Sequence, residues 1–310
     1  MELLTEQPRK RRAIVIGGSI AGLFVGAFLR RVGWQVDIYE RSSIDLIGRG
    51  VGIIATHPEL FEALDKCGAG TVDIGVIVYK RITLDRSGKV IAEKPLLQIV
   101  TSWDRLRQVL LKVIDRQRYH FGYVFERVEQ DGSSKLKQMC VDEHGAEYEF
   151  GIPPPLVRKD LIAQMRAEAE TLLPPQYLDC LRHIYQPFFT PVYDFCSPRL
   201  VFGRVALVGD AASTPRPHIG FGVSKAAAEA QALAEALSSY DDIDQALAVY
   251  NVARQPLSER IVLHARKLGM QLGVGIVTDE DRKFAKLLQS PEGVLDWFGM
   301  PNFLAAHPNL

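Results

Sequence analysis

Residues 13–40 read AIVIGGSIAGLFVGAFLRRVGWQVDIYE, a run with apolar blocks, a glycine-rich turn and a final acid. The β-branched block 13–16 predicts a short strand that is buried on both faces. Apolar residues then recur at helical spacing after Gly22, until Gly33 ends the helix. The alternating segment 35–40 predicts the next strand. Strand, glycine turn, helix, strand and terminal acid together form a fingerprint of dinucleotide binding in an α/β fold.

The glycine turn carries the residue types that a pyrophosphate site requires. Gly17 permits a tight turn, and Gly18 and Ser19 keep the backbone slim where phosphates approach. Ser19 replaces the usual middle glycine, which is acceptable only outside the backbone conformations reserved for glycine. Gly22 lets the helix pack closely on the strand, and the helix N-terminus attracts phosphates. The predicted pyrophosphate-binding residues are Gly17, Gly18, Ser19, Ile20, Ala21 and Gly22.

Glu40, at the end of the second predicted strand, is an acceptor for the ribose hydroxyls of an adenosine. Two other interpretations of this region stay open. A glycine-rich turn also suits an α/β protein that binds no nucleotide. The uncharged run 13–29 after the basic cluster 9–12 resembles a signal peptide or a short membrane span. Its four glycines and the Arg30–Arg31 pair that ends it favour a strand and a helix instead.

The composition excludes several classes of protein. The chain has 310 residues, 37 basic and 37 acidic side chains, and 47% hydrophobic residues, which is enough for a large core. A formal charge of zero argues against a nucleic-acid-binding protein held by phosphate contacts. The 4 cysteines are scattered without a CxxC pair, so neither a disulfide framework nor a metal site is predicted. A reducing, cytoplasmic location is expected.

A second pattern occupies residues 201–222. VFGRVALVGDAA predicts a buried strand over 205–208 that ends beside Asp210, and a proline-rich loop then leads to a Gly-Phe-Gly segment. A helix of high propensity is predicted over 223–237. A carboxylate at a strand end can hold polyol hydroxyls, and the amides of a helix start can stabilise negative charge on an electron-rich ring. The alternative is an N-cap acid followed by a proline-stiffened loop.

With these residues, the sequence resembles the group A flavoprotein aromatic hydroxylases, which are single-component FAD-dependent monooxygenases. RVALVGDAA resembles their second FAD motif, and GGSIAGL resembles their variant of the first. The stretch GDAASTPRPHIGFGVSKAAAEA is similar to the 2,6-dihydroxypyridine 3-hydroxylase subgroup. The resemblance covers most of residues 11–150 and 196–270. It implies an α/β protein with a Rossmann-like FAD-binding domain, a mixed sheet and helices.

The resemblance also implies roles for particular residues. Glu40 would bind the adenosine ribose, and Arg41 would lie beside the adenine. An arginine that many members direct to FAD aligns with Trp103 here, and Arg105 or Arg107 would replace it. The residues implied at the flavin half are Asp210, for the ribityl chain, and Pro217, Gly220, Phe221 and Gly222, near the ring.

The reaction follows from the same resemblance. It implies FAD, reduction by NAD(P)H, and transfer of one oxygen atom of O2 through a flavin C4a-hydroperoxide. The substrate would be a small, electron-rich aromatic or heteroaromatic ring. His218 is the candidate base that would deprotonate a ring hydroxyl, and a loop-packing role is its alternative. No membrane span is predicted, and a homodimer is compatible with the sequence.

The middle of the chain departs from the family. After predicted strands at 124–128, 136–141 and 146–150, family members continue into a third motif, GADG-x-S-x-VR, and a large antiparallel sheet over the flavin. Here a predicted helix at 158–173 follows instead, and the segment 131–134 is interpreted as a hairpin loop. A central block of about 100 residues, the size of a small domain, is therefore missing.

Residues 71–100 are interpreted as a remnant of the substrate domain, with strands at 74–79, 81–84 and 89–92. Without partners, these strands would leave an exposed edge or an apolar face. The strand 205–208 is expected in the same sheet as 13–16. Helices are also predicted at 58–66, 103–114, 243–254 and 256–268. The predicted organisation is FAD-binding parts at 1–70, 101–155 and 199–270, the remnant at 71–100, a shortened connector at 156–198 and a C-terminal tail at 271–310.

Three functions remain open from the sequence. The first is an FAD-dependent hydroxylase whose compact form or oligomer closes the active site. The second is a shortened family member, catalytically impaired, that binds FAD weakly or not at all. The third is a non-flavin Rossmann dehydrogenase, which the second FAD motif and the lack of a Tyr-x-x-x-Lys pair after a strand argue against.

Overall fold

The computed structural model describes residues 11–43, 53–55, 57–126, 140–141, 147–148, 152, 156–185, 187, 189 and 191–298. Its first unit is β1 (Arg12–Ile16), α1 (Ile20–Arg31) and β2 (Gln35–Glu40), with β1 and β2 parallel. A third strand, β6 (Tyr119–Phe121), adds to β2 in parallel, which gives the order β1-β2-β6. The predicted strand, turn, helix and strand are confirmed, and Glu40 ends β2 as expected.

The two faces of this sheet differ in their burial. Val15, Val36 and Ile38 point to one face and are buried, whereas Ile14 is 68% exposed and Ile16 is 53% exposed. Because successive side chains of a strand point to opposite faces, α1 covers only one of them. The prediction that the strand 13–16 is buried on both faces is therefore wrong.

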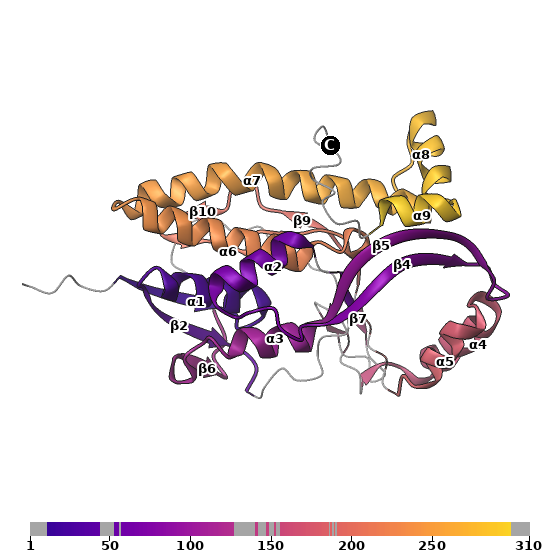
Figure 1. Ribbon diagram of the computed structural model, residues 1–310, viewed down its shortest axis with the longest axis horizontal. Helices are drawn as coiled ribbons and strands as arrows, with labels where there is room; N and C mark the ends of the chain where they lie inside the picture. The colour runs from indigo at the N-terminus through magenta and orange to yellow at the C-terminus, as the bar shows by residue number, and fades with distance from the viewer. Residues whose placement is uncertain are drawn as a thin grey trace, which may run out of the picture.

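Four further helices pack on α1 or on one another: α2 (Pro58–Cys67), α3 (Trp103–Leu111), α6 (Gly222–Ser239) and α7 (Ile243–Leu268). Helix α6 packs between α1 and α7, as Figure 1 shows. The helices predicted at 243–254 and 256–268 are one continuous helix, with Pro256 inside it. Buried residues on both sides of the proline, Tyr250 and Ile261, hold the two halves in one line.

The segment after Leu200 forms a tight antiparallel hairpin, β10 (Val201–Phe202) with β11 (Val205–Ala206). The expectation that 205–208 joins the sheet of β1 is wrong, because β11 pairs with β10 in a separate sheet. Gly203, with φ +58°, makes the turn between them. The Leu207 amide then donates to the Leu200 carbonyl at 2.8 Å, so this backbone bonds within the hairpin.

A long hairpin, β4 (Val76–Leu84) and β5 (Val90–Ser102), extends away from α1, α2 and α3 (Figure 1). With β3 (Ile53–Ala55) it forms an antiparallel sheet in the order β3-β5-β4. The strands predicted at 74–79 and 81–84 are one strand with a change of register between Val78 and Lys80. The predicted exposed apolar surface is confirmed by the exposed side chains of Val76, Ile77, Tyr79 and Leu97.

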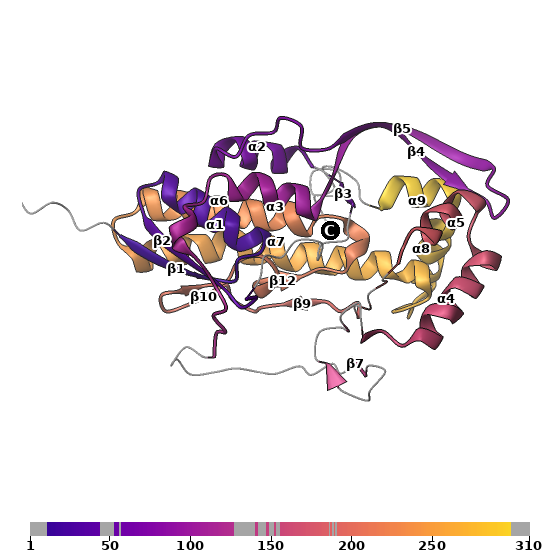
Figure 2. The same cartoon turned by 90° about the horizontal axis from the view of Figure 1, so that it is seen from below.

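Helices α8 (Asp279–Gln289) and α9 (Pro291–Trp297) form the tail, for which the sequence makes no prediction. Helix α9 lies along the long hairpin, as Figure 2 shows. The Thr83 hydroxyl donates to the Pro291 carbonyl at 3.1 Å, and Lys94 pairs with Asp296 at 2.7 Å. The tail thus covers part of the sheet that contains the long hairpin.

The shortened connector contains α4 (Lys159–Leu172) and α5 (Pro175–Arg182), and α4 confirms the helix predicted at 158–173. Two short strands, β7 (Cys140–Val141) and β8 (Glu147–Tyr148), pair in the region of the predicted meander. The predicted loop 131–134 lies outside the described residues. No helix within the described ranges has the length and apolar content to cross a membrane.

The close packing of α1 on its preceding turn is testable at Gly22. A Cβ at this position would overlap the carbonyl oxygen of Gly17, which belongs to the backbone and has no rotamer to escape to. We expect Gly22→Ala to lower the free energy of unfolding by about 1–3 kcal/mol in urea denaturation. The control is Gly222→Ala at the start of α6, where a Cβ meets nothing within 4 Å. Equal losses in both variants would contradict the packing explanation.

Candidate cofactor site

The turn between β1 and α1 has the conformation that a pyrophosphate site needs. Gly17 has φ +96°, which favours glycine, and its amide donates to the Tyr39 carbonyl at 2.8 Å. Ser19 has φ −78° and ψ −172°, so its backbone lies outside the conformations reserved for glycine and a side chain is acceptable there. Ser19 does not cap α1 with its side chain, which leaves the helix N-terminus accessible to an anion.

Gly18 is a glycine for a different reason from the one that the sequence suggests. A Cβ there would overlap the hydroxyl of Tyr119, which donates to the Gly18 carbonyl at 2.9 Å. Arg107, 3% exposed, donates to that hydroxyl at 3.4 Å, and its guanidinium lies 5.9 Å from the ring centre of Trp103. Arg107 therefore stabilises the turn indirectly, because it binds the Tyr119 hydroxyl that donates to Gly18.

Glu40 is buried, with 5% exposure, and its carboxylate joins the turn to the end of β2. One oxygen accepts from the Gly18 amide at 2.8 Å, and the other accepts from the Ser42 amide at 2.9 Å. Because a carboxylate oxygen has two lone pairs, each oxygen keeps capacity for a ligand hydroxyl. Arg41 is exposed beside it. The structure thus brings the predicted ribose and pyrophosphate residues together.

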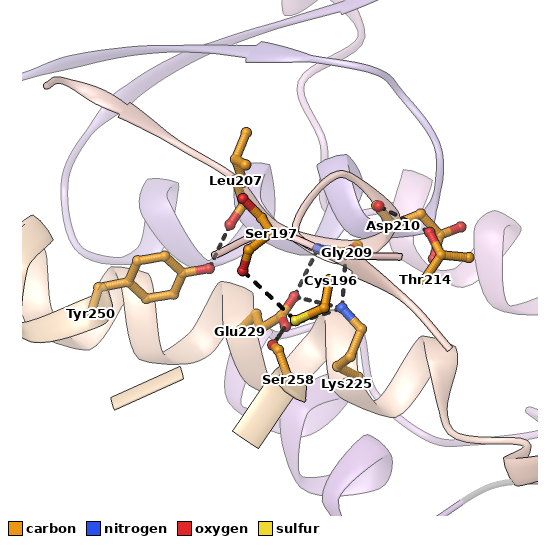
Figure 3. Close-up of polar contacts among 10 residues, drawn as sticks. All are labelled: Cys196, Ser197, Leu207, Gly209, Asp210, Thr214, Lys225, Glu229, Tyr250 and Ser258. Carbon is orange, nitrogen blue, oxygen red and sulfur yellow. Dashed lines mark hydrogen bonds and ion pairs between the residues drawn. The ribbon is translucent and has the colours of Figure 1, made fainter. Parts of the chain in front are cut away.

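The second motif forms a short 3₁₀ turn, η3 (Gly209–Ala211), rather than a strand end. Gly209 has φ +69°, and a Cβ there would lie 2.5 Å from the Cβ of Ala21 in α1. The two predicted motifs are therefore in contact through this glycine. The Asp210 carbonyl accepts from the Thr214 hydroxyl at 3.1 Å, as Figure 3 shows.

Asp210 reaches the surface, yet protein atoms surround much of its carboxyl group. This desolvation raises the pKa of Asp210, the Lys225 charge opposes the rise, and the Glu229 charge adds to it. Among the residues that the structure describes, no protein donor binds either oxygen of this carboxylate. Asp210 is thus an acceptor that a ligand can use.

The loop before α6 contains the remaining predicted flavin residues. Pro217, which is exposed, begins the 3₁₀ turn η4 (Pro217–Ile219), and Gly220 follows with φ +62°. Helix α6 begins at Gly222, one residue before the predicted start, and a Cβ at Gly222 would meet nothing within 4 Å. The backbone at Gly222 thus borders open space at a helix N-terminus.

Phe221 faces the interior and meets His57, which as a candidate base ranks below His218 in the sequence. Phe221 is 4% exposed, and its ring packs edge-on against His57 with 4.8 Å between ring centres. Burial lowers the pKa of His57 to about 4, so the ring is neutral near pH 7. Its Nε2 lies 3.3 Å from the Gly220 carbonyl, to which a neutral imidazole can donate. His57 therefore supports the loop from inside.

His218 is half-buried, and its ring packs edge-on against Phe298 with 6.2 Å between ring centres. Burial and the nearby Arg216 charge lower the pKa of His218, which keeps the imidazole neutral and able to accept a proton. Its packing fits the loop role, and its protonation fits the base role. The assignment of His218 as a base stays a prediction.

Two further residues that the sequence analysis missed lie beneath the second motif. Lys225 and Glu229 form a fully buried ion pair in α6, with 3.0 Å between charged atoms (Figure 3). A Lys and a Glu four residues apart usually indicate an exposed helix face. The signal that could have found them is their spacing from Leu233 and Leu237, which places all four residues on one stripe of the helix.

Comparisons with known proteins relate this chain to FAD-binding proteins. A family model described as FAD binding domain-like matches residues 113–194. 2,6-Dihydroxypyridine 3-monooxygenase of Paenarthrobacter nicotinovorans is 22% identical over 371 residues, which covers 86% of this chain and 93% of the relative. An alignment longer than this chain of 310 residues leaves positions of the relative without a counterpart here. This agrees with the missing central block.

Solved structures share the fold. The structure of 2,6-dihydroxypyridine-3-hydroxylase from Arthrobacter nicotinovorans matches with a TM-score of 0.77 and 22% identity, and covers 88% of this chain and 95% of its own. Klebsiella pneumoniae HpxO, complexed with FAD and uric acid, matches with a TM-score of 0.69 and 20% identity. This match covers 95% of this chain and 97% of the HpxO chain. Sequence and fold together relate the chain to the group A FAD-dependent aromatic hydroxylases and support its assignment as an oxidoreductase.

Proposed function

We propose that this chain binds FAD and hydroxylates a small, electron-rich aromatic or heteroaromatic ring with NAD(P)H and O2. The observation that carries the proposal is the contact between the two motifs. Gly209 lies against Ala21, so the helix N-terminus that would take the pyrophosphate and the Asp210 carboxylate lie within reach of one extended ligand. FAD, with a pyrophosphate between an adenosine and a ribityl-flavin, matches this order of groups.

The residues present fit this cofactor. Glu40 would accept from the adenosine ribose, beside Arg41 at the adenine, and the amides at the start of α1 would bind the pyrophosphate. Asp210 would accept from the ribityl hydroxyls with a carboxylate that has no described protein donor. The Gly220–Gly222 backbone would border the pyrimidine edge of the flavin, where the positive end of α6 stabilises negative charge.

Bound FAD would supply the reduction of dioxygen and the transfer of one oxygen atom to the ring. The chain would orient the ring system, exclude water and hold a proton acceptor near the substrate. His218 is the candidate acceptor, because its lowered pKa leaves it neutral at pH 7. A small heteroaromatic substrate is supported by the HpxO structure, which is complexed with uric acid. A cytoplasmic location and a homodimer belong to the same proposal.

A second candidate function is favoured by the missing block. The long hairpin exposes apolar side chains, with Tyr79 and Leu97 each 72% exposed, and a sheet of the family's size would cover such a surface. A shortened member with this defect would bind FAD weakly or not at all and would be catalytically impaired. The third alternative, a non-flavin dehydrogenase, has no use for the turn at Gly209 and Asp210.

Asp210 tests the flavin proposal. We expect Asp210→Ala to weaken FAD binding by about 1.5–3 kcal/mol, or ten- to a hundredfold, because the ribityl hydroxyls lose an ionised acceptor. The measurement is a titration of purified protein with FAD, followed by flavin fluorescence. Asp241→Ala, at an exposed carboxylate, is the control and should bind as the wild type does. Equal affinities for Asp210→Ala and the wild type would remove Asp210 from the site.

Glu40 tests the adenosine half. In Glu40→Gln, the amide NH2 would face either the Gly18 or the Ser42 N–H, which are both donors. We expect weaker binding of both ADP and FAD by about 1–3 kcal/mol, measured by calorimetric titration, and a lower unfolding free energy. Glu235→Gln on the exposed face of α6 is the matched control. Unchanged binding of ADP would contradict the assignment of Glu40 to the ribose.

A further inference from the structure

The buried ion pair of α6 needs an explanation, because the proposed function does not use it directly. Lys225 and Glu229 are each 0% exposed, one helical turn apart. Taking two charges out of water is costly, and their mutual attraction offsets this only when further hydrogen bonds satisfy both groups. A pair of well-packed apolar residues would fill the same space without that cost. The further partners of the pair therefore indicate what it does.

Both charged groups bind the same residue. The Gly209 amide donates to Glu229 Oε2 at 2.8 Å, and Lys225 Nζ donates to the Gly209 carbonyl at 2.8 Å. The Ser258 hydroxyl, from α7, donates to Glu229 Oε1 at 2.9 Å and fixes the carboxylate from the other side. Figure 3 shows these groups converging on the turn from beneath. The pair thus holds Gly209 by both its N–H and its carbonyl group.

Gly209 is the residue whose conformation directs Asp210. It has φ +69° and packs against Ala21, so a change in its dihedral angles would move Asp210 and break the contact with α1. Glycine is the residue with the widest backbone freedom, and this freedom has to be removed if the next side chain is to point in one direction. The hydrogen bond that Lys225 donates to Gly209 and the one that Glu229 accepts from it restrict this freedom.

We propose that the Lys225–Glu229 pair is a positioning element of the cofactor site, which holds the Gly209 turn and thereby directs the Asp210 carboxylate to the ribityl chain. The inference rests on the proposed function, because it needs FAD at Asp210. The pair touches no ligand in this assignment and acts through Gly209. A merely structural pair would stabilise α6 against α7 and have no specific effect on the flavin half of the cofactor.

The test is a double-mutant cycle between Glu229→Gln and Asp210→Ala, with FAD and ADP as separate ligands. We expect Glu229→Gln to weaken FAD binding by about tenfold when Asp210 is present, and by less than about twofold in the Asp210→Ala background. ADP lacks the ribityl chain and the flavin. Its affinity for Glu229→Gln, with or without Asp210→Ala, should therefore lie within about twofold of its affinity for the wild type. Glu235→Gln, with its exposed hydrogen bond to Gln231 in the same helix, is the matched control.

Removing one buried charge can prevent folding, so a second variant accompanies the first. Lys225→Met combined with Glu229→Gln leaves no unpaired charge in the interior and should give the same pattern. Equal losses of FAD affinity with and without Asp210, or a parallel loss for ADP, would overturn the positioning role. If instead Asp210→Ala alone binds FAD as the wild type does, the assignment of Asp210 in the proposed function fails, and the positioning role fails with it.

Discussion

The left-handed turn at Gly209 is the constraint on which the proposed cofactor site depends. Its φ of +69° favours glycine, and its contact with Ala21 leaves no room for a side chain. The second motif therefore approaches the N-terminus of α1 through backbone and a single methyl group. The separation of the pyrophosphate turn from Asp210 is set by this contact, which is less adjustable than a contact between long side chains.

The two turns of the site are held in the same way. At Gly18, an acid accepts from the amide and a hydroxyl donates to the carbonyl: Glu40 at 2.8 Å and Tyr119 at 2.9 Å. At Gly209, Glu229 accepts and Lys225 donates, each at 2.8 Å. Each turn thus has its peptide groups satisfied by buried side chains from distant parts of the chain. Burying these polar groups is tolerable because each has its partner.

The sequence predicted what depends on neighbouring residues. The strand, turn and helix of 13–40 follow from apolar spacing and glycines, and the start of α6 follows from Gly-Phe-Gly before a run of helix formers. The prediction failed where distant segments decide. The exposure of Ile14 depends on what covers the second face of β1. The pairing of β11 with β10 is an exception, because it follows from the local turn at Gly203, which the prediction did not use. The roles of Lys225 and Glu229 depend on the backbone of Gly209, which lies 16 residues from Lys225 in the sequence.

The described geometry separates binding of the cofactor from oxidation of a substrate. The groups that would bind FAD lie in α1, β2, the Gly209 turn and the start of α6, and none of them belongs to the missing block. Exclusion of water from the flavin ring is a different requirement, for which the resemblance implies a large antiparallel sheet in full-length members. Among the described elements of this chain, the hairpin β4–β5 with helix α9 is the part that most resembles such a sheet. The hairpin still exposes Tyr79 and Leu97. Within the described ranges, a hydroxylase would therefore need a cover over the ring beyond this hairpin and helix, whereas a shortened member that only binds FAD would not.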